Sequence, residues 1–368
     1  MEKKSRTAKI IAVLVILMMS LTMCLTGCGN ESDDSGSADN DSKDVKTISF
    51  TDDCDREVKV PEKIEKVIAS GPLAQIFLLA IAPDTLIATN SAWSDDVKKY
   101  IDKKYLDLPE VGQFFGNHDL NYEEIAKLSP DVIIDVGESK PTMKSDLEDI
   151  TEKTNIPAIH IDANVDDLDR AFTRLGELLG REDQASDLAE YCKSAYDETE
   201  KAIKNVDKKA KVMYCTAEDG LNVLAKDSYH SQILDKYADN VAVLDDPSSK
   251  GTGNEVNIEQ MINWDPDVII FAPNSYYKFV KKDKAWNTLT AVKNNNFYEV
   301  PAGPYDWMGN PPSCNRLLGQ IWLIKLLYPD EADYDLKDMV KQYYKLFYQY
   351  DLSDDEYDGL VKNSIGKK

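Results

Sequence analysis

The sequence predicts an α/β protein with two similar lobes, a long rigid helix between them and a ligand cleft between the lobes. From residue 46 onward, short apolar strands alternate with helices, which is typical of parallel sheets covered on both faces. One helix-and-strand unit occurs twice, as NYEEIAKLSPDVIIDVG at 121–137 and as NIEQMINWDPDVIIFAP at 257–273. A long helical stretch separates the two copies. Each lobe is therefore expected to be Rossmann-like, with a mainly parallel sheet.

The N-terminus has the pattern of an export signal, assigned to residues 1–27. The first nine residues are rich in Lys and Arg, and an apolar run follows from Ile10 to Met23. This run is shorter than the roughly 20 residues of a membrane span. It leads into LTGC, which resembles the lipobox of bacterial lipoproteins. The resemblance implies that cleavage leaves Cys28 as the lipidated first residue; a signal peptide cut nearby or an uncleaved anchor would also export the chain.

Composition separates the next segment from the two lobes. Residues 29–44 contain no large apolar side chain, so 28–45 is interpreted as a flexible acidic tether. The first lobe is assigned to 46–165 and the helical region to 166–206. The second lobe, with the C-terminal helices of the chain, is assigned to 207–368. The net charge of −23 argues against direct binding of nucleic acid or anionic lipid headgroups.

Strand and helix signals alternate through the first lobe. TISFTDD and REVKV predict a hairpin with acidic residues at its turn. Elsewhere, β-branched apolar runs predict strands, whereas flanking prolines and helical periodicity predict helices. Strands are expected at 66–70, 86–90, 131–136 and 156–162, and helices at 71–83, 95–105 and 121–128.

Two helices fill the region between the lobes. The first places Leu168, Phe172, Leu175 and Leu179 on one face. The second is expected from Glu182 to Val206, and about 25 residues would span roughly 37 Å, enough to cross between two domains.

The second lobe repeats the alternation of the first. It ends in an apolar helix followed by two acidic, Tyr-rich helices. Strands are expected at 211–217, 240–244, 267–273 and 295–303, and helices at 227–238, 257–264 and 311–329.

Four cysteines lie beyond the tether, and their spacing favours no pairing. They are scattered without a CxxC motif. Export permits disulfides, and four cysteines allow three pairings, so both disulfides and free thiols remain open for Cys54, Cys192, Cys215 and Cys314.

The order of these motifs resembles a known family. TISFTDDCDREVKVPEKIEKVIAS, NYEEIAKLSPDVIID, LGELLGREDQA, NIEQMINWDPDVII and PPSCNRLLGQIWLIKLLYP together are similar to the solute-binding proteins of ABC importers for iron–siderophore, haem and cobalamin. The resemblance covers the chain from residue 46 onward. It implies a monomeric, lipid-anchored protein without enzyme activity or cofactor, which captures an iron(III)–siderophore complex and delivers it to a permease and its ATPase. Cobalamin, haem or another metal chelate is the alternative ligand.

The same resemblance implies two docking residues. In that family each lobe presents a Glu to arginines of the permease. The matching residues here are Glu123 and Glu259, which occupy the same position in the two copies of the repeat. Glu124 is a neighbour that could take this role in the first lobe.

Loops at the carboxyl ends of the strands are expected to line the cleft. They are rich in aromatic side chains, which suit a large, partly apolar ligand with polar edges. The candidate ligand-binding residues are Trp93, Phe114, Phe115, Tyr214, Tyr229, His230, Tyr276, Tyr277, Tyr305 and Trp307.

Charged residues and histidines narrow the choice of ligand. No arginine falls in these loops, although Arg316 opens the helix after one of them, so a neutral hydroxamate complex or cobalamin is favoured over a carboxylate-rich chelate. His118 and His230 are weak candidates for metal ligation from opposite walls, and Met308 could replace one of them. His160 lies in an apolar strand and is expected in the core.

Other classes of function find little support. The sequence contains no GxSxG, HExxH or GxxxxGK[ST] motif and no Cys/His metal cluster, so an exported hydrolase is a weak alternative. No feature of the sequence indicates an adhesin or a scaffold protein.

Overall fold

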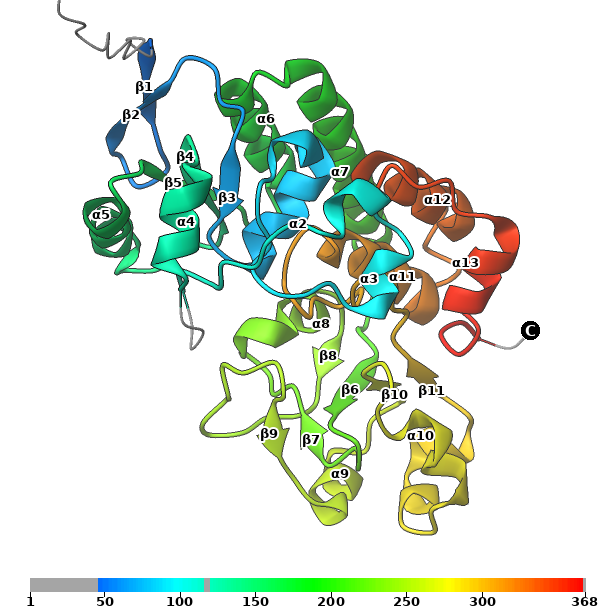
Figure 1. Ribbon diagram of the computed structural model, residues 1–368. Coiled ribbons are helices and arrows are strands. Elements are labelled where there is room, and N and C mark those ends of the chain that lie inside the picture. The colour runs from blue at the N-terminus through cyan, green and yellow to red at the C-terminus, as the bar shows by residue number, and fades with distance from the viewer. Residues whose placement is uncertain (1–45, 116–119, 367–368) are drawn as a thin grey trace, which may run out of the picture. The chain divides into compact units, whose positions relative to one another are not determined.

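The computed structural model describes residues 46–115 and 120–366. These residues contain two mainly parallel sheets, each with its own helices (Figure 1). The predicted α/β class with two such sheets is therefore confirmed. The expected lipidation site Cys28, the tether and His118 lie outside the described residues.

The first sheet consists of β3 (Val67–Ala69), β4 (Val132–Gly137) and β5 (Ala158–Asp162), all parallel in the order β3-β4-β5. Alternate residues of β4 point to opposite faces, so that Ile133 packs in one hydrophobic cluster while Val132 packs in another. Parallel strands covered on both faces read as continuous apolar runs, which is why DVII was recognisable as a strand.

Helices cover both faces of this sheet. Pro72 occupies the first turn of α2, where its missing N–H leaves no hydrogen bond unmade. One hydrophobic cluster contains side chains of α2 (Pro72–Ile81) and α6 (Leu168–Leu179), and the other contains side chains of α4 (Tyr122–Leu128) and α5 (Met143–Thr154).

The predicted hairpin precedes this sheet. β1 (Thr47–Thr51) pairs antiparallel with β2 (Glu57–Pro61). At its turn, Asp52 Oδ1 accepts hydrogen bonds from the backbone N–H groups of Cys54 and Arg56, at 3.0 and 3.1 Å. This acidic side chain therefore closes the turn, as aspartates often do.

A helix of 22 residues, α7 (Glu182–Ile203), follows α6 and leads from the first sheet to the first strand of the second. At 1.5 Å per residue it is about 33 Å long. The four residues predicted on one face of α6 are all buried. α7 packs against α6, α11 (Arg316–Leu327) and α12 (Leu336–Phe347).

The second sheet has the order β11-β10-β6-β7-β9, and β8 also pairs with β6. β6 lies parallel to β10 and β8, and β11 lies parallel to β10, whereas β7 pairs antiparallel with β6 and β9. The strands are β6 (Lys211–Thr216), β7 (Asn222–Val223), β8 (Asp239–Asn240), β9 (Asn254–Glu255), β10 (Val268–Phe271) and β11 (Phe297–Glu299). The other helices of this half are α8 (Gln232–Tyr237), α9 (Ile258–Trp264), α10 (Thr290–Lys293) and α13 (Asp354–Leu360).

The repeated unit forms the same structure twice. Asn121 caps α4 by accepting a hydrogen bond from Glu124 N at 3.0 Å, and Asn257 caps α9 by accepting one from Gln260 N at 2.9 Å. Both helices end at a residue with a left-handed backbone, Ser129 or Asp265. The shared Asn thus has the same capping role in both copies.

Several predicted elements were wrong or too long, including the strand expected at 295–303, which is limited to β11. Residues 86–90 form only isolated bridges, and the side chain of Asn90 donates to the carbonyls of Ala69 and Gly112. The polar helix expected at 95–105 is limited to α3 (Asp95–Lys98). Of the strand expected at 240–244, only Asn240 belongs to a strand, β8 (Asp239–Asn240), and α5, β7 and β9 were not predicted.

Among the residues described, no helix is both long enough and apolar enough to cross a membrane.

Candidate functional site

A small pocket of about 160 Å³, lined by both polar and apolar side chains, lies at the carboxyl ends of the strands in the second sheet. Tyr214 and Thr216 of β6 line it, as does Ala272 directly after β10. The loops that carry Gly251 and Asp306 complete its wall. This is where ligands bind in parallel α/β sheets, so the pocket is the best candidate for the functional site.

His230 is another residue that lines this pocket. It lies in a short 3₁₀ turn before α8, and its buried Nδ1 has no hydrogen-bond partner among the described residues. Burial lowers the pKa of His230, and the positive charge of Arg316 lowers it further, against the opposing effect of the Gly309 carbonyl. The imidazole is therefore neutral at pH 7, which is the form that ligates metals or accepts a proton.

Tyr214 and Asp306 form another part of the wall. The Tyr214 hydroxyl donates to Asp306 Oδ2 at 3.2 Å, and Met308 N donates to Asp306 Oδ1 at 2.6 Å. Burial raises the pKa of Asp306 to about 7. A buried carboxyl group that titrates near neutral pH can donate or accept a hydrogen bond. This pair can therefore bond to either a donor or an acceptor atom of a ligand.

Arg316 lies beside this pocket and makes contact with both lobes. Its Nη1 donates to Gln232 Oε1 at 2.5 Å, and both Nη atoms lie 3.4 Å from Glu138 Oε1. Gln232 Nε2 in turn donates to Glu138 Oε2 at 3.1 Å. Glu138 follows β4 of the first sheet, whereas Gln232 begins α8. Sequence reasoning missed Arg316 as a site residue because it looked for arginines in loops, and Arg316 is the first residue of α11.

The aromatic candidates of the first lobe lie in different surroundings. Trp93 is buried, and its Nε1 donates to the carbonyl of Tyr105 at 2.8 Å. Phe114 and Phe115 are partly buried. Lys140 Nζ lies 4.1 Å from the centre of the Phe115 ring. None of the three lines the pocket beside His230.

The aromatic candidates of the second lobe divide into two groups. Tyr214 lines the pocket, and the Tyr229 ring lies edge-on to His230 with centroids 5.2 Å apart. Tyr276 and Tyr277 instead pack in the hydrophobic cluster of the second sheet. The remaining two pack outside the pocket: Tyr305 is partly buried 6.5 Å from Tyr348, and Trp307 is fully buried.

A row of buried polar side chains crosses the first sheet. Ser70 donates to Asp135, whose other carboxylate oxygen lies 2.7 Å from His160 Nδ1. Asp135 and His160 are paired in register on neighbouring strands. His160 is fully buried, as its apolar strand predicted. Because Ser70 bonds to the carboxylate and not to the imidazole, this row lacks the connectivity of a Ser-His-Asp triad.

The two candidate docking residues occupy equivalent exposed positions. Glu123 is the second residue of α4 and Glu259 the second residue of α9. Neither carboxylate makes an ion pair within the described part of the chain, whereas Glu124 pairs with Lys127 at 3.3 Å. Carboxylates are stabilised in a first helical turn, so both positions suit an accessible acidic side chain.

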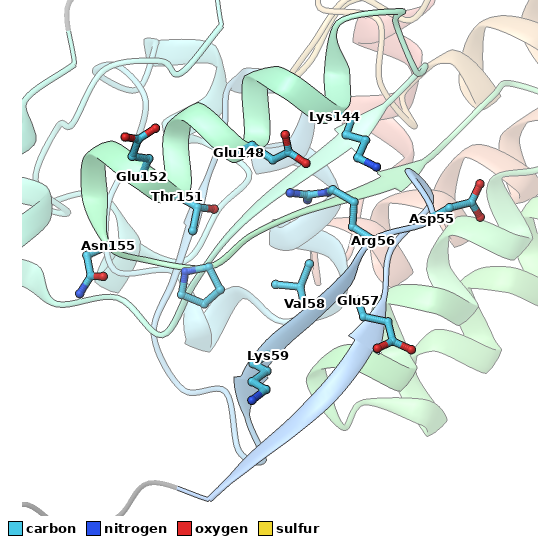
Figure 2. Close-up of a pocket in the computed structure, with 11 residues that line it drawn as sticks. Asp55, Arg56, Glu57, Val58, Lys59, Lys144, Glu148, Thr151, Glu152 and Asn155 are labelled. Carbon is cyan, nitrogen blue, oxygen red and sulfur yellow. The ribbon is translucent and has the colours of Figure 1, made fainter. Parts of the chain in front are cut away.

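A larger groove, of about 800 Å³, lies elsewhere in the first lobe between β2 and α5 (Figure 2). Figure 2 shows the guanidinium of Arg56 in this groove, with Lys144 and Glu148 on the helix above it. Arg56 already bonds to Asp52 and to the carbonyl of Ala158. Charges of both signs line this groove, and Pro157 places it at the amino end of β5. It therefore lies at the opposite end of the strand from a typical ligand cleft.

Side chains that could hold a metal ion are dispersed in the described residues. No group of three or more His, Cys, Asp or Glu residues there could form a metal site. Each of the four cysteines beyond the tether is free, so the question that their spacing left open is answered in favour of thiols.

Comparison with known proteins agrees with the two-sheet architecture. The family model described as periplasmic binding protein matches residues 68–304. A solved ABC transporter solute-binding protein from Sulfurospirillum deleyianum is similar, with 30% sequence identity, a TM-score of 0.77, and coverage of 85% of this chain and 99% of that one.

Two curated relatives are more distant. The molybdate-binding protein MolA of Haemophilus influenzae is 25% identical over 331 residues, which are 82% of this chain and 90% of MolA. The high-affinity heme uptake system protein IsdE of Staphylococcus aureus is 25% identical over 244 residues, 63% of this chain and 79% of IsdE. With the family model covering well over half of the chain, the protein belongs to the periplasmic binding proteins and is a solute-binding component of an ABC importer, not an enzyme.

Proposed function

We propose that this protein captures a metal-containing solute outside the cytoplasm and delivers it to an ABC permease. The observation that carries the proposal is the pocket lined by His230, whose buried Nδ1 has no hydrogen-bond partner in the described part of the chain, and by the Tyr214–Asp306 pair. Unpartnered buried polar atoms are uncommon in folded proteins. A ligand that bonds to this nitrogen would satisfy it.

The size of the pocket favours a compact ligand. Pockets for drug-sized ligands usually enclose about 300–1,000 Å³, whereas this pocket has about 160 Å³. A metal oxyanion, or a metal ion with a small chelator, fits this volume. MolA, which is named as a molybdate-binding protein, makes the oxyanion the leading candidate. An iron(III)–siderophore, which the sequence suggested first, is larger than this pocket, as are cobalamin and haem.

Membrane attachment and permease docking complete the proposal. A lipid on Cys28 would keep a monomeric protein close to its importer, provided that more than one acyl chain is attached. Glu123 and Glu259 would then meet basic residues of the permease, one from each lobe. The helix α7 would restrict the movement of the lobes, because it connects the two sheets in the chain.

A thermal-shift panel tests the ligand proposal. The soluble protein that starts after Cys28 is heated with molybdate, ferric citrate, a neutral ferric hydroxamate, cobalamin or haemin. A ligand at about 100 times its Kd adds roughly 2.7 kcal/mol to the free energy of unfolding, which raises the Tm by several degrees. A shift with molybdate or ferric citrate would support the compact ligand. A shift with cobalamin or haemin alone would replace it with a macrocycle, and no shift at all would contradict the proposed ligand classes.

A further inference from the structure

One carboxylate of the first lobe reaches a buried arginine of the other half of the chain. Glu138 follows the last residue of β4, and Arg316 begins α11. The Arg316 side chain is 5% exposed, whereas that of Glu138 is 21% exposed. Glu138 therefore has an edge that is open to solvent, whereas Arg316 does not. If Glu138 leaves, another acceptor has to take its place, because an unpaired buried charge is strongly destabilising.

The contact between these two residues is loose. Both Nη atoms of Arg316 are 3.4 Å from Glu138 Oε1, whereas charge-assisted N–H···O bonds are typically about 2.7–2.9 Å long. Arg316 Nε is buried and has no partner among the described residues. The guanidinium therefore has unused donor capacity, in addition to a partner that it holds weakly.

Arg316 is also a positive charge beside the pocket wall. Its Cγ lies 2.8 Å from the position that a Cβ on Gly309 would occupy, so its stem packs against this wall residue. Its charge contributes to the lowered pKa of His230, and the charge of Glu138 contributes to the raised pKa of Tyr229, after burial in each case. These electrostatic effects thus connect four neighbouring side chains: Glu138, Tyr229, His230 and Arg316.

We propose that Glu138 determines the charge selectivity of the site. In the unliganded protein it neutralises Arg316 and joins the two lobes through Gln232. An anionic group of the ligand, either an oxyanion or a carboxylate of a chelate, displaces Glu138 and pairs with Arg316. A neutral ligand gains nothing from this exchange. The inference rests on the proposed function, and it identifies Glu138 as the residue against which an anionic ligand competes.

The test measures the Kd of molybdate, ferric citrate, cobalamin and a neutral ferric hydroxamate for the wild type and for Glu138→Gln. Glutamine keeps the shape of the side chain and its contact with Gln232, but it removes the competing charge. Anionic ligands should bind at least about tenfold more tightly to the variant, while the Kd of neutral ligands should change by less than about twofold. Glu200→Gln is a matched control, because Glu200 is 25% exposed and pairs with Lys236 on α8 at 3.3 Å, away from the pocket lining.

The double variant Glu138→Gln with Arg316→Gln separates charge from shape. It should lose the gain in anion affinity without leaving a carboxylate unpaired. If ligands bind but anions show the same Kd with wild type and Glu138→Gln, the charge-selectivity inference is overturned and the proposed function stands. If no panel member binds to the wild type or to any variant, both are overturned.

Discussion

The Tyr214 hydroxyl donates a hydrogen bond to Asp306 at 3.2 Å, and burial raises the pKa of this carboxyl group from 3.8 to about 7. The folded protein therefore binds this proton more tightly than the unfolded chain does. The contribution of the protonated group to stability is complete below about pH 4 and is lost as the pH rises through about 7. Above that pH the fold has to hold a buried anion.

Asp306→Asn removes this ionisation but keeps an acceptor for Tyr214. We expect the variant to gain stability relative to the wild type as the pH rises. Between pH 5 and pH 8, the difference in unfolding free energy between variant and wild type should change by about 2–3 kcal/mol in favour of the variant. Urea unfolding at the two pH values measures this change. A difference that is the same at both values would show that Asp306 does not titrate in this range.

The two copies of the repeat offer an internal comparison of one interaction. Asp131 Oδ2 accepts hydrogen bonds from the backbone N–H groups of Glu65 and Lys66, both at 2.8 Å. Asp267 Oδ2 accepts a single bond, from Lys211 N at 3.2 Å. We expect Asp131→Ala to lower the unfolding free energy by about 1–2 kcal/mol and Asp267→Ala by about half as much. Equal losses in denaturant unfolding would refute this ranking.

Two glycines close in sequence should respond differently to alanine. A Cβ on Gly251 would lie 3.2 Å from Cε1 of His230, while one on Gly253 would lie 2.2 Å from the carbonyl oxygen of Val223, at a φ of +72°. Gly251→Ala should weaken ligand binding by roughly 1 kcal/mol, or about fivefold, because the imidazole has to shift. Gly253→Ala should instead destabilise the fold by about 1–3 kcal/mol. Ligand titration and thermal unfolding of both variants would contradict this division if Gly251→Ala lost only stability.

The docking proposal predicts that substitution of Glu123 and Glu259 impairs transport but not ligand binding. Glu123→Gln and Glu259→Gln should leave the ligand Kd unchanged, since neither residue lines the pocket. Together they should reduce uptake by an importer reconstituted in vesicles by about tenfold. Glu190→Gln, an exposed position on α7, serves as the control. Uptake that survives the double change would remove both residues from the docking surface.

Local signals in the sequence predicted the repeat and most of the strands. The DVII runs are buried on both faces, and the asparagine caps fix where α4 and α9 begin. These features depend on neighbouring residues, so the sequence alone carries them. Residues 86–90 form only isolated bridges, and the Asn90 side chain there donates to the distant carbonyl of Gly112 as well as to that of Ala69. Those contacts have no signature in the local sequence.

The candidate site was only partly predictable. Loop position predicted Tyr214 and His230 as neighbours in one site, and both line one pocket in the structure. It could not distinguish them from Trp307 and Tyr277, whose rings pack in hydrophobic clusters of the core. Arg316 was not among the predicted ligand-binding residues, because it is the first residue of a helix and not part of a loop. Which aromatic or charged side chain faces a pocket depends on packing between distant elements, and periodicity does not encode that packing.

The central claim is that the ligand bonds to His230, and isothermal titration calorimetry of the ligand that gives the largest thermal shift tests it most directly. The titration compares wild type with His230→Ala, after equal Tm values without ligand have shown that both are folded. We expect the Kd of the variant to rise at least about tenfold, because a hydrogen bond or metal bond to the ligand is lost. Equal Kd values for the two proteins would contradict the account and place the ligand elsewhere.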